Sequence, residues 1–135
     1  MVYSQWVVVE VYNKFRHSDI TIKEATIDYG KYHENGNKDN NLEPEDINGI
    51  VIKPGKVGYV SACGKAEIHY GTDGTFALFD GSTKICKLFF DVPYHKSTND
   101  FQVKDRNDDY AVSVSEWNRE GGALGNVRVN VGKFG

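Results

Sequence analysis

Apolar and polar residues alternate with a period of two along most of the chain, which is typical of strands that bury one face. Residues 5–12 show this most clearly, because Val7, Val9 and Val11 lie on one face and Val8 and Glu10 on the other. The remaining segments with strand character are residues 20–29, 49–53, 56–61, 76–79, 83–90, 101–103, 110–115 and 127–131. The pattern predicts eight or nine strands and no amphipathic helix of ten residues.

Two turn dipeptides predict hairpins. Pro54-Gly55 divides residues 49–53 from residues 56–61, and Asp80-Gly81 divides residues 76–79 from 83–90. Gly supplies the positive φ angle that a tight turn needs, so the second pair is the strongest hairpin in the sequence. Its arms are apolar on both faces, which predicts a central position in a sheet.

Two other segments depart from regular alternation. The period of residues 20–29 changes phase around residues 23–25, which indicates a β-bulge. Residues 32–46 are polar and contain several turn dipeptides, so we expect a long loop there. Closely spaced strands and turns predict an all-β fold, a two-sheet antiparallel β-sandwich, with residues 1–135 as a single domain.

Composition supports this fold class. The chain has 15 Val and 8 Ile but only 11 Leu, Ala and Met together, and β-branched residues favour pleated, half-buried surfaces. A net charge of −3 disfavours nucleic acid and tight adhesion to anionic lipid. The longest apolar run near the start, residues 6–9, is too short to span a membrane. No basic segment precedes it, so we expect a soluble protein without a cleaved signal peptide.

Catalytic and metal-binding motifs are weak. The four histidines are far apart in sequence, and no nucleophile elbow or phosphate-binding loop occurs. Carboxylates cluster at residues 43–46 and 105–109, where they could act as an acid and base or bind calcium, but solvated loops explain both clusters better. Residues 121–125 are rich in glycine and predict a turn at one end of the sandwich. We expect no catalytic residue, no metal and no cofactor. Cys63 and Cys86 are predicted to be free, buried thiols.

Several aromatic residues fall outside the alternation or beside turns. Trp and Tyr combine an apolar ring with a polar tip, which suits a membrane–water interface or a ligand cleft. The alternative is that these rings fill the second face of the sandwich, and composition leaves the two readings even. The residues concerned are Trp6, Tyr29, Tyr32, Tyr70, Tyr94 and His95.

Short motifs in order along the chain are similar to those of one known family. They are Tyr3-Ser-Gln-Trp6, residues 29–33 and 36–39, Ala62-Cys63-Gly64-Lys65, residues 71–76, 81–85 and 91–94, Ser97-Thr-Asn-Asp100, and Trp117-Asn118 with residues 121–129. On these segments the sequence resembles the aegerolysins over nearly its whole length. The resemblance implies an aegerolysin/actinoporin-like β-sandwich that binds membrane lipid and is not an enzyme.

The resemblance also implies partners. Aegerolysins recognise sphingolipids, either ceramide phosphoethanolamine or sphingomyelin with sterol. Several act as the docking component of a two-component pore-forming cytolysin, whose larger partner is of the membrane-attack-complex/perforin (MACPF) class, and some bacterial pairs are insecticidal. We therefore expect release by a non-classical route and action at the surface of a target cell. A lectin-like or protein-interaction β-sandwich without pore formation is the alternative.

Individual positions carry the family's site with substitutions. Trp6 matches a membrane-facing tryptophan, and Tyr29 and Tyr94 stand where the family has Trp. Tyr70 replaces a Glu that the sphingomyelin-binding members of the family carry, which favours binding of ceramide phosphoethanolamine here. Lys96 lies one position before the family's lipid-contacting Lys, which is Ser here. The predicted lipid-binding residues are Trp6, Tyr29, Tyr70, Tyr94, His95 and Lys96.

Overall fold

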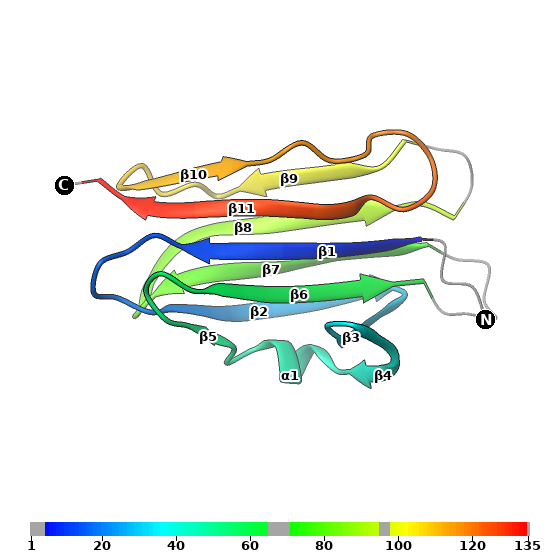
Figure 1. Ribbon diagram of the computed structural model, residues 1–135, viewed down its shortest axis with the longest axis horizontal. Coiled ribbons are helices and arrows are strands. Elements are labelled where there is room, and N and C mark those ends of the chain that lie inside the picture. The colour runs from blue at the N-terminus through cyan, green and yellow to red at the C-terminus, as the bar shows by residue number, and fades with distance from the viewer. Residues whose placement is uncertain (1–4, 65–70, 95–97, 135) are drawn as a thin grey trace.

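A computed structural model describes residues 5–64, 71–94 and 98–134. In these residues it contains eleven strands and one short helix. They are β1 (Trp6–Asn13), β2 (Ile20–Tyr29), β3 (Lys31–Glu34), β4 (Asn37–Leu42), α1 (Pro44–Ile47), β5 (Val51–Ile52), β6 (Val57–Cys63), β7 (Thr72–Asp80), β8 (Thr83–Val92), β9 (Asp100–Lys104), β10 (Tyr110–Val114) and β11 (Gly125–Lys133). Two sheets lie face to face, which confirms the predicted β-sandwich (Figure 1).

The sheets have different strand orders. One is six-stranded, in the order β10-β11-β1-β6-β3-β4, and the other is five-stranded, in the order β5-β2-β7-β8-β9. β1 and β11 run parallel although they come from opposite ends of the described chain, and the other described pairs are antiparallel. The strand pair β7–β8 lies inside its sheet, as its apolar arms predict.

The core lies between the sheets and follows from the alternation of side chains. Val7, Val9 and Val11 are fully buried on the inner face of β1. Tyr32 of one sheet meets Phe90 of the other edge to face, with ring centroids 6.0 Å apart. The Tyr32 hydroxyl donates to the Thr26 carbonyl oxygen at 2.7 Å, so this ring satisfies its polar tip inside the core.

Local expectations about the bulge and the second hairpin are confirmed. The register of β2 against β7 shifts between Lys23 and Thr26, and Glu24 has a positive φ of 59°. β7 and β8 pair up to Asp80 and Thr83, and Gly81 between them has φ of 60°. Positive φ at a non-glycine residue such as Glu24 is uncommon and marks the bulge as the strained point of β2.

Two local predictions are wrong. The polar segment 32–46 is not a loop: it contains all of β4 and most of β3 and α1. The segments on either side of Pro54-Gly55 do not form a hairpin, because β5 pairs with β2 and β6 pairs with β1 and β3 in the opposite sheet. The turn at Pro54-Gly55 therefore carries the chain from one sheet to the other.

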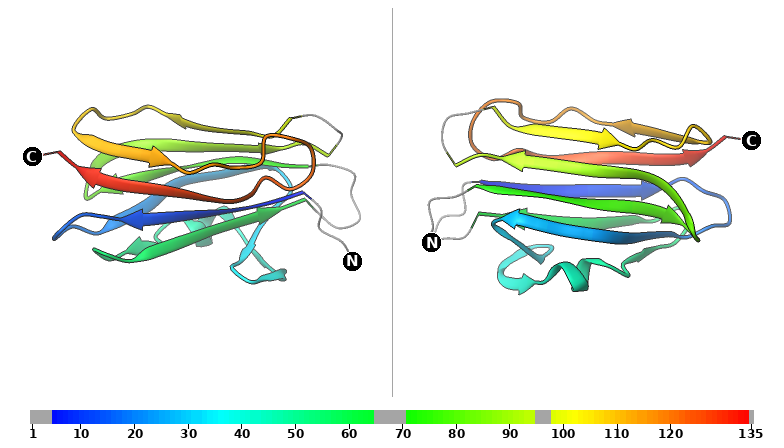
Figure 2. Two further views of the ribbon diagram at one scale, coloured as in Figure 1. Left: turned by 45° about the horizontal axis from the view of Figure 1, so that its top comes forward. Right: turned by 180° about the vertical axis from the view of Figure 1, so that it is seen from behind.

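The two ends of the sandwich differ in what they contain. At one end β1, β7, β9 and β11 begin and β2, β6 and β8 end, and we call it the loop end; it lies on the right of Figure 1. At the opposite end, which we call the turn end, the β7–β8 hairpin turns and β10 begins (Figure 2).

Candidate functional site

The described members of the predicted site lie together at the loop end. Trp6 is the first residue of β1, Tyr29 is the last residue of β2, and Tyr94 follows the end of β8 by two positions. Tyr29 is 54% exposed and Tyr94 is 37% exposed, while Trp6 is partly buried. Three further predicted residues lie outside the described part of the chain: Tyr70, His95 and Lys96.

Gly30 explains why Tyr29 stands at the rim. It has φ of +81°, and a Cβ there would lie 2.6 Å from both the Cys63 carbonyl oxygen and the Thr72 side chain. No residue with a side chain fits this contact. The chain therefore turns tightly from β2 into β3, which belongs to the other sheet, and Tyr29 is left pointing outward at the turn.

Trp6 is fixed from two directions. Its carbonyl oxygen accepts a hydrogen bond from the Leu124 backbone N–H at 3.0 Å, which ties the connection before β11 to β1. The Lys38 ammonium group lies 4.9 Å from the centroid of the indole ring. A cation over an indole face is a favourable contact, worth about 0.5–1 kcal/mol at an exposed site.

A row of carboxylates continues from Tyr29 across the five-stranded sheet. Tyr29 is paired with Asp73, Asp73 with Asp91, and Asp91 with Asp100, so the four residues form one lateral line over β2, β7, β8 and β9. All three aspartates are half-buried. Adjacent carboxylates in one row repel each other, which makes this line a place where a cation is stabilised.

The electrostatics of the row agree with that interpretation. Burial raises the pKa of Asp73, and the neighbouring Asp91 and Asp28 carboxylates raise it further, against a hydrogen bond from the Tyr29 backbone. Burial and Asp100 raise the pKa of Asp91. Within the described residues, the Oδ1 atom of Asp73 is buried and has no hydrogen-bond partner. A ligand with N–H or O–H donors would stabilise this carboxylate.

The connection between β10 and β11 also lies at the loop end, and it was not included in the site predicted from the sequence. Asn99 is buried, and its side-chain Nδ2 donates to the carbonyl oxygens of Asn118, Glu120 and Gly122 at 2.7–3.2 Å. The guanidinium group of Arg119 stacks 4.1 Å from the ring centroid of Trp117. Residues 121–125, predicted as a glycine-rich turn, form the end of this connection, which confirms that prediction.

The part of the chain that the structure describes has neither a metal-binding cluster nor a membrane-spanning helix. Residues 5–64, 71–94 and 98–134 contain no group of three or more His, Cys, Asp or Glu side chains that could hold a metal ion. The described helix has four residues, so no helix in this part of the chain is long enough to cross a membrane. Cys63 and Cys86 are both buried and free, in different sheets.

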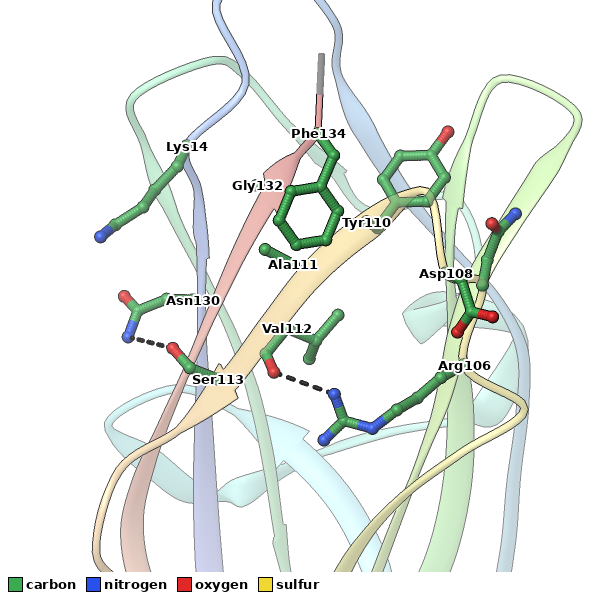
Figure 3. A pocket seen from close by; sticks show the side chains of 11 residues that line it. Lys14, Arg106, Asp108, Tyr110, Ala111, Val112, Ser113, Asn130, Gly132 and Phe134 are labelled. Atoms are coloured by element: carbon green, nitrogen blue, oxygen red, sulfur yellow. Dashed lines mark hydrogen bonds between the residues drawn. The ribbon is translucent and has the colours of Figure 1, made fainter.

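The turn end has a hollow of its own, which contains none of the predicted lipid-binding residues. It has a volume of about 460 Å³ and lies over the outer face of β10 and β11, where the small residues Ala111, Ser113 and Gly132 form its floor (Figure 3). Lys14 and Phe134 stand at its rim. Its lining carries the cations of Lys14 and Arg106 beside the carboxylate of Asp108, whereas the row at the loop end consists of carboxylates.

The fold is an all-β, two-sheet sandwich with the rings of Tyr29 and Tyr94 exposed at one end. Residues 4–134 match the family model described as Aegerolysin, and the chain belongs to the aegerolysin family. Membership of this family of hemolysins and lipid-binding proteins supports a membrane-lipid-binding, cytolysin-like role.

The chain is similar to individual relatives over nearly their full length. The chain is 39% identical to Asp-hemolysin of Aspergillus fumigatus over 97% of this chain and 94% of that protein. It is 32% identical to ostreolysin A6 of Pleurotus ostreatus over 100% of this chain and 99% of that protein. The crystal structure of RahU in complex with a Tris molecule superposes with a TM-score of 0.94 at 28% identity, covering 99% of this chain and 98% of that chain.

Proposed function

We propose that this protein is a sphingolipid-binding docking component of a two-component pore-forming cytolysin, which acts at the surface of a target cell with a MACPF/perforin-like partner. The observation that carries the proposal is the grouping of Trp6, Tyr29 and Tyr94 at one end of a rigid sandwich. Trp and Tyr rings at such an end anchor at the lipid headgroup level, where the apolar ring is buried and the polar tip stays hydrated.

The carboxylate row supports a preference among headgroups. The ammonium group of ceramide phosphoethanolamine carries N–H donors, and the carboxylates of Asp73 and Asp91 beside Tyr29 can accept hydrogen bonds from them. The trimethylammonium group of sphingomyelin has no such donors. We therefore propose that binding favours ceramide phosphoethanolamine, and that insect membranes, which are rich in this lipid, are the target.

The need for a partner follows from the use of the strands. A membrane-spanning strand has about 9–11 residues, and the strands of that length here, including β2, β7 and β8, are paired within the sandwich. Releasing one of them would break the core. We propose that this chain alone binds liposomes without making pores, and that dye release requires a second, larger protein.

Sedimentation with liposomes tests the lipid site directly. Tyr29→Ala and Tyr94→Ala should each weaken binding about tenfold, because each removes a ring of about 1.4 kcal/mol from the interface. Tyr59→Ala is the matched control, since Tyr59 is 43% exposed but lies on the outer face of β6 away from the loop end. Equal loss of binding in the Tyr59 variant would show that the loop end is not the docking surface.

The headgroup and partner proposals need separate arms. Liposomes with matched sterol that differ only in ceramide phosphoethanolamine or sphingomyelin should bind the protein unequally, with the ethanolamine lipid preferred. Equal or stronger binding to sphingomyelin would contradict the headgroup assignment while leaving the docking surface intact. Strong dye release by the chain alone at low concentration would contradict the division of labour between two components.

A further inference from the structure

A groove beside the loop end lies on the outer face of the six-stranded sheet. One row of paired residues crosses this face, from His33 on β3 through Ser61 on β6 and Val8 on β1 to Asn126 on β11. The turn between β3 and β4 stands over the row. The groove between them has a volume of about 490 Å³ and is lined by Trp6, Val8, His33, Asn35, Gly36, Asn37, Lys38, Asp39 and Asn126.

The hydrogen-bond state of His33 limits what can occupy this groove. The side chain is 3% exposed, and its Nδ1 atom lies 2.7 Å from the Glu34 carbonyl oxygen. A carbonyl oxygen only accepts, so Nδ1 carries the proton and donates. Burial lowers the pKa of His33 against the hydrogen bond to the Glu34 carbonyl oxygen, which raises it, and the nearby Lys38 and Lys31 lower it further, so the ring is neutral near pH 7.

The other ring nitrogen is therefore a hydrogen-bond acceptor. Within the described residues, Nε2 of His33 is buried and has no partner. A buried acceptor without a donor costs about 1–3 kcal/mol, and a ligand that brings a donor to it regains this free energy. The Ser61 Oγ donates to the Oδ1 of Asn35, which also lines the groove, at 3.2 Å.

The remaining lining selects the class of ligand. An anion would face the lone pair of the His33 Nε2 and the carboxylate of Asp39. The Lys38 ammonium group in the lining already lies over the Trp6 ring, so a phosphate or carboxylate fits poorly. Amide groups on Asn37 and Asn126 both donate and accept, which suits hydroxyl groups. Trp6 and Val8 offer an apolar surface beside them. An apolar surface next to several amides matches a sugar ring, which has a C–H face and a rim of hydroxyls.

We propose that this groove is a carbohydrate subsite that takes one neutral hexose-type ring, with a hydroxyl donating to the His33 Nε2 and the ring resting against Trp6 and Val8. Because the groove adjoins the loop end, such a ring fits as the head of a membrane glycolipid as well as a soluble sugar. The subsite shares Trp6 with the sphingolipid site of the proposed function, but a soluble glycoside tests it without a membrane.

Ligand-observed NMR tests the subsite with methyl glycosides of glucose, galactose, mannose and N-acetylglucosamine as probes. At least one glycoside should receive saturation from the protein at millimolar concentration. Its binding should shift backbone amide signals of Val8, Asn37 and Asn126. No saturation transfer to any of the four probes, with the protein folded, would overturn the proposal.

A matched pair of variants locates the binding. Asn126→Ala removes an exposed amide from the groove and should weaken glycoside binding about five- to tenfold, the worth of one or two hydrogen bonds. Asn130→Ala is the control, because Asn130 lies four residues later on β11, on the same face but outside the groove. Equal losses in both variants would place the sugar elsewhere and overturn the assignment.

Two liposome arms separate the sources of the sugar. Vesicles with a monohexosylceramide should bind the protein more strongly than vesicles with ceramide alone if the ring comes from a glycolipid, and Asn126→Ala should remove that difference. Soluble glycoside binding without a liposome difference would assign the subsite to free or protein-linked glycans. In both cases the sphingolipid arms described above are scored independently, so the failure of one proposal does not decide the other.

Discussion

The two ends of the sandwich share the same sheets but differ in how their polar groups are hydrogen-bonded. At the turn end, the buried Asn13 side chain donates to the Ser18 and Ile52 carbonyl oxygens at 2.9 and 2.8 Å and accepts from the Phe15 N–H at 2.8 Å. At the loop end, Tyr29 is exposed and the Oδ1 atom of Asp73 has no partner in the described residues. Polar groups are satisfied where the fold is held and left unsatisfied where a ligand is expected.

Charge shows the same division. The Lys133 ammonium group lies 3.4 Å from Asp80 at the turn end, and the Tyr110 hydroxyl donates to the same carboxylate at 2.8 Å. In the described residues of the loop end, Asp73 and Asp91 face each other without a cation between them. A carboxylate that lacks a protein cation can receive the ammonium group of a zwitterionic lipid. The comparison therefore predicts that changes at the two ends separate stability from lipid binding.

The largest effect should come from Asn13→Ala. This change removes three hydrogen bonds and leaves two carbonyl oxygens and one N–H group buried beside β5 and Phe15. The free energy of unfolding, measured by urea titration, should fall by about 3 kcal/mol. Liposome binding per folded molecule should not change, because the residue lies at the turn end. A loss below about 1 kcal/mol would show that the hydrogen bonds of Asn13 do not stabilise the turn end.

Asn99→Ala makes the corresponding change at the loop end. Three carbonyl oxygens of residues 118–122 lose their donor, but these residues are exposed or half-buried and water can replace it in part. Unfolding free energy should fall by about 1–2 kcal/mol. Lipid binding should weaken as well, since the connection that carries Trp117 loses its anchor. Unchanged liposome sedimentation in the folded variant would exclude this connection from the docking surface.

The sequence predicts the central strands of the fold better than the strands at the sheet edges. Alternation and Asp80-Gly81 locate β1, β7 and β8 because local sequence determines each of them. β4 shows no alternation, since its residues are mostly exposed, and it is a strand only because β3 pairs with it. The dipeptide Pro54-Gly55 predicts a turn correctly but carries no information about which sheet receives the next strand.

The site shows the same limit. The resemblance to the family identifies Trp6, Tyr29 and Tyr94, and the structure places these rings at one end. The row of Asp73, Asp91 and Asp100 was missed, because it depends on the register between three strands. Each aspartate has an ordinary place at a strand end in the sequence. Pairing, which a single sequence does not contain, makes them neighbours.

A smaller and opposite effect should follow from Asp73→Asn. The pKa of Asp73 is raised in the folded protein, so its charged form is disfavoured there relative to the unfolded chain. This penalty is present at neutral pH and is relieved as the pH falls through the folded pKa towards the ordinary value of about 4. At pH 7 the variant should therefore be slightly more stable than the wild-type protein, and the gain should shrink towards pH 4.

The same variant should bind ceramide phosphoethanolamine more weakly, since the amide cannot neutralise the ammonium group. Urea titrations at several pH values and liposome sedimentation at pH 7 measure the two effects. Asp108→Asn is a control, because Asp108 lies at the turn end, where it lines the hollow over β10 and β11. A variant that gains stability and keeps its lipid affinity would remove the carboxylate row from the headgroup site.

The smallest effect concerns the two thiols, one near each end. Cys63 is the last residue of β6 at the loop end, whereas Cys86 is the fourth residue of β8, nearer the turn end. Both are fully buried, and burial raises the pKa of Cys63 and raises that of Cys86 to about 12. Neither should react quickly with a thiol reagent in the native state, and about two thiols should react in denaturant without reductant.

Strand ends open more often than strand interiors, so slow native labelling followed by mass spectrometry should modify Cys63 before Cys86. Earlier labelling of Cys86 would show that the turn end opens first, and a thiol count near zero in denaturant would show a disulfide.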